Sequence, residues 1–183
     1  MPKIIKIRKG LDIKLKGKAE PATGTISGIN RYALRPVDFL GLVPRMLVQP
    51  EDCVLAGTPL FYDKYRPDIL FPSPVSGKVL SVIRGERRKI LEIEIESDGK
   101  FESVAFSAEE VAMSDRESVK KTLLKSGLWP FIIQRPFGVI ANPSDDPQAI
   151  FVSGFDSAPL SPDYAYTLAD ESESLQKGID VLS

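Results

Sequence analysis

Three arginines, Arg84, Arg87 and Arg88, gather on one short polar turn between two segments that have the character of strands. Guanidinium groups this close repel one another unless carboxylates or phosphates face them. One interpretation is that the turn docks on acidic groups outside the chain. The other is that the arginines pair internally with the glutamates of the following segment, residues 92–96. Both interpretations stay open, and the three arginines are the candidate docking residues.

Lys64 is the second residue with a chemical role to consider. Residues 50–60 resemble the first-half pattern of lipoyl- and biotin-carrier domains, and residues 73–79 resemble the start of the second half. Such carriers hold a modified lysine on a tight hairpin between the halves, and Lys64 is the lysine available there. It lacks the methionine neighbours of a carrier lysine, and Arg66 and Pro67 alter the hairpin. We interpret Lys64 as a surface lysine, with a swinging-arm carrier modified at Lys64 as the alternative.

Several kinds of chemistry are excluded by composition. The chain has no histidine, which removes Ser-His-Asp and Cys-His triads and histidine-based zinc or haem sites. The single cysteine, Cys53, allows no internal disulfide and no iron–sulfur motif, and we expect it to be a buried small hydrophobe. Gly-rich phosphate-binding motifs are absent. The net charge of −1 disfavours a nucleic-acid partner. We predict no catalytic, cofactor-binding or metal-binding residue.

Short strands separated by Gly and Pro turns are predicted for the first part of the chain. They are expected near residues 45–49, 58–62, 69–72, 77–84 and 88–96, with further β structure at residues 3–9. The strand at 88–96 alternates with period two, so Leu91, Ile93 and Ile95 should share a buried face opposite the intervening glutamates.

The pattern changes near residue 105. Ser-x-x-Glu sequences at 107–110 and 114–117 are typical of helix starts, and the helix that follows the second should stop at Gly127. The β-branched run at 149–154 predicts a buried strand, and residues 171–182 predict a helix. We therefore predict an all-β module over residues 1–104 and the first part of a truncated α/β domain over residues 105–183.

The chain as a whole resembles the N-terminal portion of the A subunit of the bacterial Na+-translocating NADH:quinone reductase. The segments that carry this resemblance are residues 5–12, 34–36, 57–64, 73–77, 84–88, 126–129, 135–137 and 149–152. The order RGERR, SGLW and RPF is the most specific part. A related electron-transport complex shares the N-terminal lipoyl-like module in its C subunit, but that protein carries cysteine-rich cluster motifs, which this chain lacks.

This resemblance implies a mixed fold, a lipoyl/biotinyl-like barrel-sandwich hybrid followed by the start of a Rossmann-like α/β domain. It implies a peripheral subunit on the cytoplasmic face of the bacterial inner membrane that supports assembly of the complex and is a candidate for ubiquinone binding. Flavins and iron–sulfur centres are expected on partner subunits, with no redox cofactor in this chain. The arginine turn, or the basic residues between 3 and 18, would then dock on acidic loops of the membrane subunits or on lipid headgroups.

A transmembrane segment of the chain's own is not expected. The best apolar candidate, residues 128–141, is interrupted by Pro130, Gln134, Arg135 and Pro136 and is shorter than the roughly 20 residues that a span needs.

A quinone site would need an apolar slot with a few polar groups. Four aromatic residues could line one: Trp129, Phe131, Phe137 and Phe151. Packing of these rings in a core is the preferred interpretation, because large aromatic side chains most often serve there. No quinone ligand is therefore assigned.

Overall fold

The computed structural model describes residues 10, 15–17, 20–106, 115–156, 158 and 160–182. The β structure expected at 3–9 and the helix start expected at 107–110 lie outside these residues. The chain divides into two compact units, one of Ile26–Pro147 and one that includes Gln148–Ser183. Each unit is described by itself. The domain boundary predicted between residues 104 and 105 falls inside the first unit and stays a prediction.

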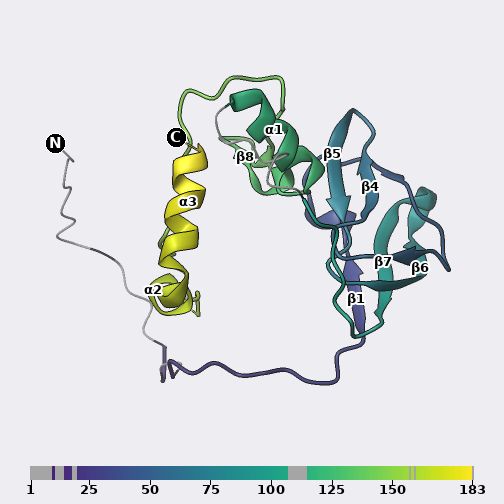
Figure 1. Cartoon of the computed structure of the whole chain (residues 1–183), viewed down its shortest axis with the longest axis horizontal. Coiled ribbons are helices and arrows are strands. Elements are labelled where there is room, and N and C mark those ends of the chain that lie inside the picture. The colour runs from purple at the N-terminus through teal and green to yellow at the C-terminus, as the bar shows by residue number, and fades with distance from the viewer. Residues whose placement is uncertain are drawn as a thin grey trace. The chain divides into compact units, whose positions relative to one another are not determined.

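Two antiparallel sheets make up most of the first unit (Figure 1). The four-stranded sheet has the order β1-β7-β6-β3 and the three-stranded sheet the order β2-β4-β5. The strands are β1 (Arg31–Leu34), β2 (Pro44–Met46), β3 (Cys53–Val54), β4 (Pro59–Asp63), β5 (Arg66–Pro72), β6 (Gly77–Arg84) and β7 (Ile90–Ser97). Short 3-10 turns, η1 (Pro36–Asp38) and η2 (Glu86–Arg88), precede β2 and β7. The five strands predicted between residues 45 and 96 are confirmed as β2, β4, β5, β6 and β7.

The core lies between the two sheets, because both contribute to one buried cluster. Phe61 of β4 and Phe71 of β5 stack with ring centroids 4.6 Å apart, and Phe39 meets the Phe71 ring edge-on at 4.9 Å. Ile93 and Ile95 of β7 are fully buried in the same cluster. Each such side chain contributes about 1.5–3 kcal/mol by leaving water. The strand pattern predicts an all-β module, and the structure shows that its strands form two sheets around one core.

The predicted alternation in β7 fails at Leu91. It is an exposed residue, whereas its neighbour Ile90 is buried. The pairing of β6 with β7 shifts register here, since Ile83 pairs with Glu92 and Arg84 with Ile90, which leaves Leu91 unpaired. Beyond a bulge of this kind, each side chain points to the opposite face of the sheet from the one that strict alternation predicts. The alternation is therefore confirmed at Ile93 and Ile95 and wrong at Leu91.

The rest of the first unit packs on β5. It contains α1 (Arg116–Lys125), η3 (Trp129–Phe131) and the β8–β9 hairpin (Ile133–Gln134 and Val139–Ile140). The N-cap of α1 is Asp115, whose carboxylate accepts a hydrogen bond from the Ser118 N–H at 3.1 Å. Ser114 of the predicted capping box lies outside the described residues.

Gly127 ends α1, as predicted. The Leu128 N–H donates to the Leu123 carbonyl at 3.0 Å, the closing bond of a Schellman motif, and Gly127 has a φ of 73°. A Cβ at this position would lie 2.3 Å from Cδ of Pro72 in β5. Glycine is required both by the left-handed conformation and by the closeness of the two segments.

In the second unit, α2 (Tyr164–Thr167), η4 (Ala169–Glu171) and α3 (Ser172–Leu182) follow one another. The helix predicted for residues 171–182 is confirmed as α3. The buried strand predicted for residues 149–154 is wrong, because these residues form no strand and Phe151 is 92% exposed. β-branched residues favour a strand only where a partner strand and a covering face are present.

Candidate functional site

The arginine turn is a β-turn within the connection of residues 85–89 that joins β6 to β7. The Lys89 N–H donates to the Glu86 carbonyl at 3.1 Å, so Arg87 and Arg88 occupy the two central positions. Both have positive φ, 54° at Arg87 and 61° at Arg88. A type I′ turn requires this conformation, and Asn-Gly is the sequence that adopts it best. Each arginine is strained by about 1–2 kcal/mol relative to glycine.

Internal pairing of these arginines is not formed in the part of the chain that the structure describes. Arg84, Arg87 and Arg88 make no ion pair there, and the nearest contact is from Arg84 Nη1 to the Arg88 carbonyl at 3.4 Å. Glu94, one of the partners considered from the sequence, instead accepts a hydrogen bond from the Ser81 hydroxyl at 2.7 Å. The exposed guanidinium groups are therefore available to acidic groups from outside.

A groove of ≈ 670 Å³ lies beside this turn, and we call it the basic groove. Its charged lining consists of Arg45, Lys64, Arg84, Arg88 and Lys89. Its apolar wall comes from residues 36–37, residues 39–44 and Ile90. No carboxylate belongs to the lining among the described residues. The structure thus brings together Lys64 and two of the three candidate docking arginines; Arg87 does not line the groove.

Two carboxylates close in sequence to the basic groove have partners, whereas the exposed Glu86, between Arg84 and Arg88, forms no ion pair among the described residues. Asp38 lies 3.7 Å from Arg35, and the buried Asp63 lies 2.7 Å from Arg66. Among the described residues, no ion pair involves any of the five cations of the groove. Within the described part of the chain, no carboxylate therefore pairs directly with this cluster of cations.

Lys64 stands at the tip of the hairpin between β4 and β5, in the two-residue turn Lys64-Tyr65. Asp63 and Arg66 flank this turn and form an ion pair across it. Arg66 also donates a hydrogen bond to the Ile140 carbonyl at 2.8 Å. The Lys64 ammonium lies 5.3 Å from the centre of the Tyr65 ring. Lys64 is exposed, as expected of a surface lysine, and the buried ion pair holds its backbone in a defined place.

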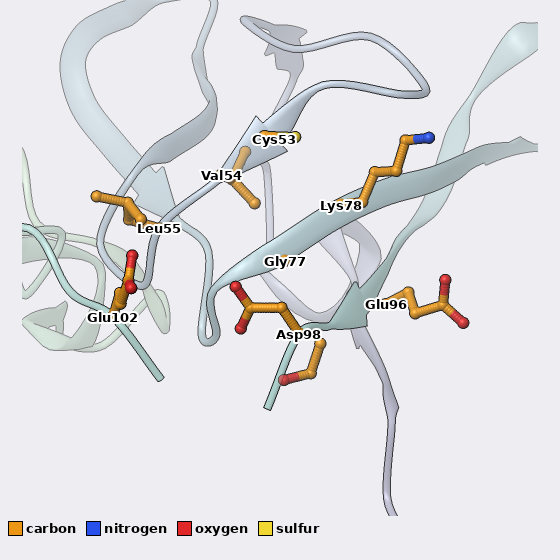
Figure 2. A pocket seen from close by; sticks show the side chains of 9 residues that line it. Cys53, Val54, Leu55, Gly77, Lys78, Glu96, Asp98 and Glu102 are labelled. Atoms are coloured by element: carbon orange, nitrogen blue, oxygen red, sulfur yellow. The ribbon is translucent and has the colours of Figure 1, made fainter. Parts of the chain in front are cut away.

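A second hollow of ≈ 440 Å³ lies on the four-stranded sheet, and we call it the carboxylate hollow (Figure 2). It is lined by Cys53, Val54, Leu55, Gly77, Lys78, Glu96, Ser97, Asp98 and Glu102. Cys53 of β3 pairs across the sheet with Lys78 of β6, and its thiol is exposed. The expectation that Cys53 is buried is wrong, because alternation along β3 turns Val54 inward instead.

Two charged residues of the carboxylate hollow, Lys78 and Asp98, have partners within the chain, whereas Glu96 and Glu102 take part in no ion pair among the described residues. The Glu51 carboxylate, which accepts a hydrogen bond from Lys78 and lies close to its charge, raises the pKa of Lys78 above its usual value of 10.5. The Ser76 hydroxyl donates to Asp98 at 2.7 Å, and the Lys100 N–H donates to it at 2.9 Å. These bonds stabilise the ionised carboxylate and lower the pKa of Asp98 below 3.8.

Of the four aromatic residues, Trp129 alone is packed against a core in the described structure. Trp129 packs against the core and donates from Nε1 to the Ala141 carbonyl at 2.8 Å, so core packing is confirmed for this residue. It is wrong for Phe131, which is 74% exposed, and for Phe137 and Phe151, which are also exposed. Within η3, Pro130 is buried and Phe131 faces water. None of the four lines either hollow.

Neither metal binding nor membrane spanning finds support in the described residues. Within the described ranges, no group of three or more Cys, Asp or Glu side chains could hold a metal ion. No described helix combines the length and apolar character needed to cross a membrane.

These features define a class: a barrel-sandwich hybrid module followed by an α/β segment. Comparison with sequence models of known families identifies the family. A sequence model described as the NqrA N-terminal barrel-sandwich hybrid domain matches residues 5–98, and one described as the NqrA second alpha/beta domain matches residues 114–183. The chain belongs to the NqrA family.

Curated relatives carry the same description. The A subunit of the Na(+)-translocating NADH-quinone reductase of Yersinia pseudotuberculosis serotype O:1b (strain IP 31758) is 39% identical over 182 residues. The proteins of the same name from Pseudomonas aeruginosa (strain UCBPP-PA14) and Haemophilus influenzae (strain PittGG) are 35% and 33% identical. Each alignment covers 98% of this chain and 41% of the relative. The chain thus spans about two fifths of the length of these relatives.

Proposed function

We propose that the chain acts as the N-terminal part of the A subunit of a Na+-translocating NADH:quinone reductase. It would be a peripheral component on the cytoplasmic face of the bacterial inner membrane, supporting assembly of the complex and contributing to ubiquinone binding. In this proposal the chain has no redox cofactor of its own, and flavins and iron–sulfur centres belong to partner subunits. The observation that carries it is the similarity to proteins of that name over 98% of the chain.

The arginine turn is the proposed docking element. Its support is geometric: Arg84, Arg87 and Arg88 are exposed, and their guanidinium groups make no ion pair among the described residues. A fork of guanidinium donors binds carboxylates or phosphates strongly. The strain at Arg87 and Arg88 adds weight, since residues held in costly backbone conformations cluster at functional sites.

Co-purification tests this proposal. The full-length protein is tagged in its host, the membranes are solubilised gently, and the proteins that follow the tag are identified by mass spectrometry. We expect flavin-bearing membrane subunits and sodium-stimulated NADH:quinone activity to follow. A protein that comes alone from the cytosol would contradict the assignment.

The docking element is tested in the same preparation. Arg87→Glu with Arg88→Glu should reduce recovery of the membrane subunits, because both charges are reversed. Lys100→Glu with Lys121→Glu is the matched control, since it changes the net charge equally at two exposed lysines outside the groove. Equal recovery from both double variants would refute docking by this turn.

A second candidate function is a carrier modified at Lys64. One observation favours it, namely the place of Lys64 at the tip of a tight hairpin whose base is closed by a buried ion pair. The intact mass of the native protein decides the question. A lipoyl- or biotin-sized addition that disappears in Lys64→Arg would establish the carrier function, and an unmodified mass would exclude it.

A further inference from the structure

The basic groove combines two kinds of surface that rarely lie together in water. Five cations line it, and the segment from η1 to β2 supplies an apolar wall beside them. Leu40 on that wall is 63% exposed, and Val43 is exposed as well. Tyr65, which follows Lys64 at the hairpin tip, is 70% exposed. Aliphatic and aromatic side chains exposed next to Lys and Arg are typical of surfaces that meet a membrane interface.

We propose that the basic groove binds the phosphate headgroup of an anionic phospholipid, with Leu40 and Val43 contacting the acyl region. The charge complementarity is direct, because the described lining holds cations and no carboxylate. Arg84 and Arg88 offer forked donors that match phosphate oxygens, and Lys64 offers a point charge at the rim.

An anionic phospholipid fits better than an acidic peptide. A carboxylate-bearing loop would satisfy the cations but would leave Leu40 and Val43 in water. A phospholipid presents a phosphate and an apolar body in one molecule, so it satisfies both parts of the groove. The strained arginine turn supplies one wall, and the rigid hairpin of Lys64 supplies another residue of the lining.

This inference names the ligand of the proposed docking element and rests on the proposed function in one respect, that the chain works beside a membrane. Its test needs no partner protein, so the two proposals can fail separately. The purified full-length chain is sedimented with vesicles of phosphatidylcholine alone and with vesicles that also contain phosphatidylglycerol. We expect binding only to the second kind, weakening as salt is added.

Variants assign this binding to the groove. Arg84→Gln with Arg88→Gln should weaken binding roughly 30-fold, the effect of removing two charges from an anionic surface. Lys100→Gln with Lys121→Gln, the matched control, should weaken it less than about threefold because neither lysine lines the groove. Leu40→Ser should weaken it severalfold at unchanged charge. Melting curves confirm that each variant is folded.

Three outcomes would overturn the proposal. Equal loss in the groove variant and its control would show that only net charge matters. Binding of inorganic phosphate to the groove arginines, without any binding to vesicles, would make free phosphate the ligand. Absence of vesicle binding, together with loss of the membrane subunits in Arg84→Gln/Arg88→Gln on co-purification, would assign the groove to an acidic partner segment.

Discussion

The two hollows of the β module differ in the signs of the charges that line them. In the carboxylate hollow, Lys78 pairs with Glu51, and Asp98 accepts hydrogen bonds from Ser76 and the Lys100 backbone. In the basic groove, five cations stand beside an apolar wall without a carboxylate in the described lining. The lining of one region contains both signs of charge. The described lining of the other contains cations alone, which a group from outside could neutralise.

This difference indicates where a partner would bind. Volume alone does not separate the two hollows, which measure ≈ 440 Å³ and ≈ 670 Å³. The balance of charge does, because an uncompensated cluster of cations costs repulsion that a ligand can relieve. The strained backbone at Arg87 and Arg88 lies in the turn beside the basic groove and favours the same region.

The largest expected difference between the two regions is the space available for a Cβ atom at a glycine of each lining. A Cβ on Gly77, in the carboxylate hollow, would lie 1.9 Å from the Glu96 carbonyl oxygen, so β6 and β7 would have to move apart. Gly77→Ala should lower the free energy of unfolding by about 3 kcal/mol or more. Gly41 lines the basic groove with a φ of 78°, and a Cβ there would make only an ordinary contact with Cγ1 of Val139 at 3.9 Å, so Gly41→Ala should cost only about 1 kcal/mol.

Urea denaturation of the two variants measures this difference. A similar loss in both would show that positive φ, and not the closeness of β7, dominates at Gly77.

A smaller effect is expected from substitutions in the arginine turn beside the basic groove. Arg87→Asn with Arg88→Gly gives the turn its preferred sequence and should raise the free energy of unfolding by about 1–2 kcal/mol. The same variant should bind anionic vesicles less tightly, because Arg88 lines the groove. Denaturation and vesicle sedimentation measure the two effects. A variant with a free energy of unfolding no higher than that of the unchanged chain would contradict the strain assigned to this turn. Unchanged vesicle binding would argue against a role for Arg88.

A subtle effect is expected for acid titration in the carboxylate hollow. The pKa of Asp98 is lowered in the folded chain, so its contribution to stability is present above the usual value of 3.8 and is lost as pH falls through the lowered pKa. Ser76→Ala removes the largest cause and should raise the pKa of Asp98 towards 3.8. Carboxyl-carbon NMR titration measures the shift. Arg84→Gln, in the basic groove, should leave the titration unchanged, and an unchanged pKa in Ser76→Ala would contradict the assigned cause.

Much of the β module could be predicted from sequence because its strands carry strong local signals. Alternation along residues 88–96 and the Gly and Pro turns around them define β6 and β7. Leu91 is misplaced by this pattern because a bulge is a property of the pairing between two strands and leaves no mark on either strand alone. Cys53 is misplaced because a strand of two residues is too short to show its phase.

The candidate site could be predicted only in part. The local cluster RGERR draws attention to Arg84, Arg87 and Arg88 from charge repulsion alone. The basic groove could not be foreseen, because Arg45, Lys64 and Lys89 come from segments far apart in sequence and meet only when both sheets form. Residues 149–154 show the opposite case, in which a strong local preference for strand finds no partner among the described residues.

The packing of α1 and η3 on β5 also bears on solubility. β5 is an outer strand of its sheet, and outer strands of separate molecules pair with one another unless something covers them. Gly127 against Pro72 and the bond from Arg66 to the Ile140 carbonyl keep the covering segment in place. A chain shortened to residues 1–104 would lose that cover, and its β5 would then be open to edge-to-edge aggregation.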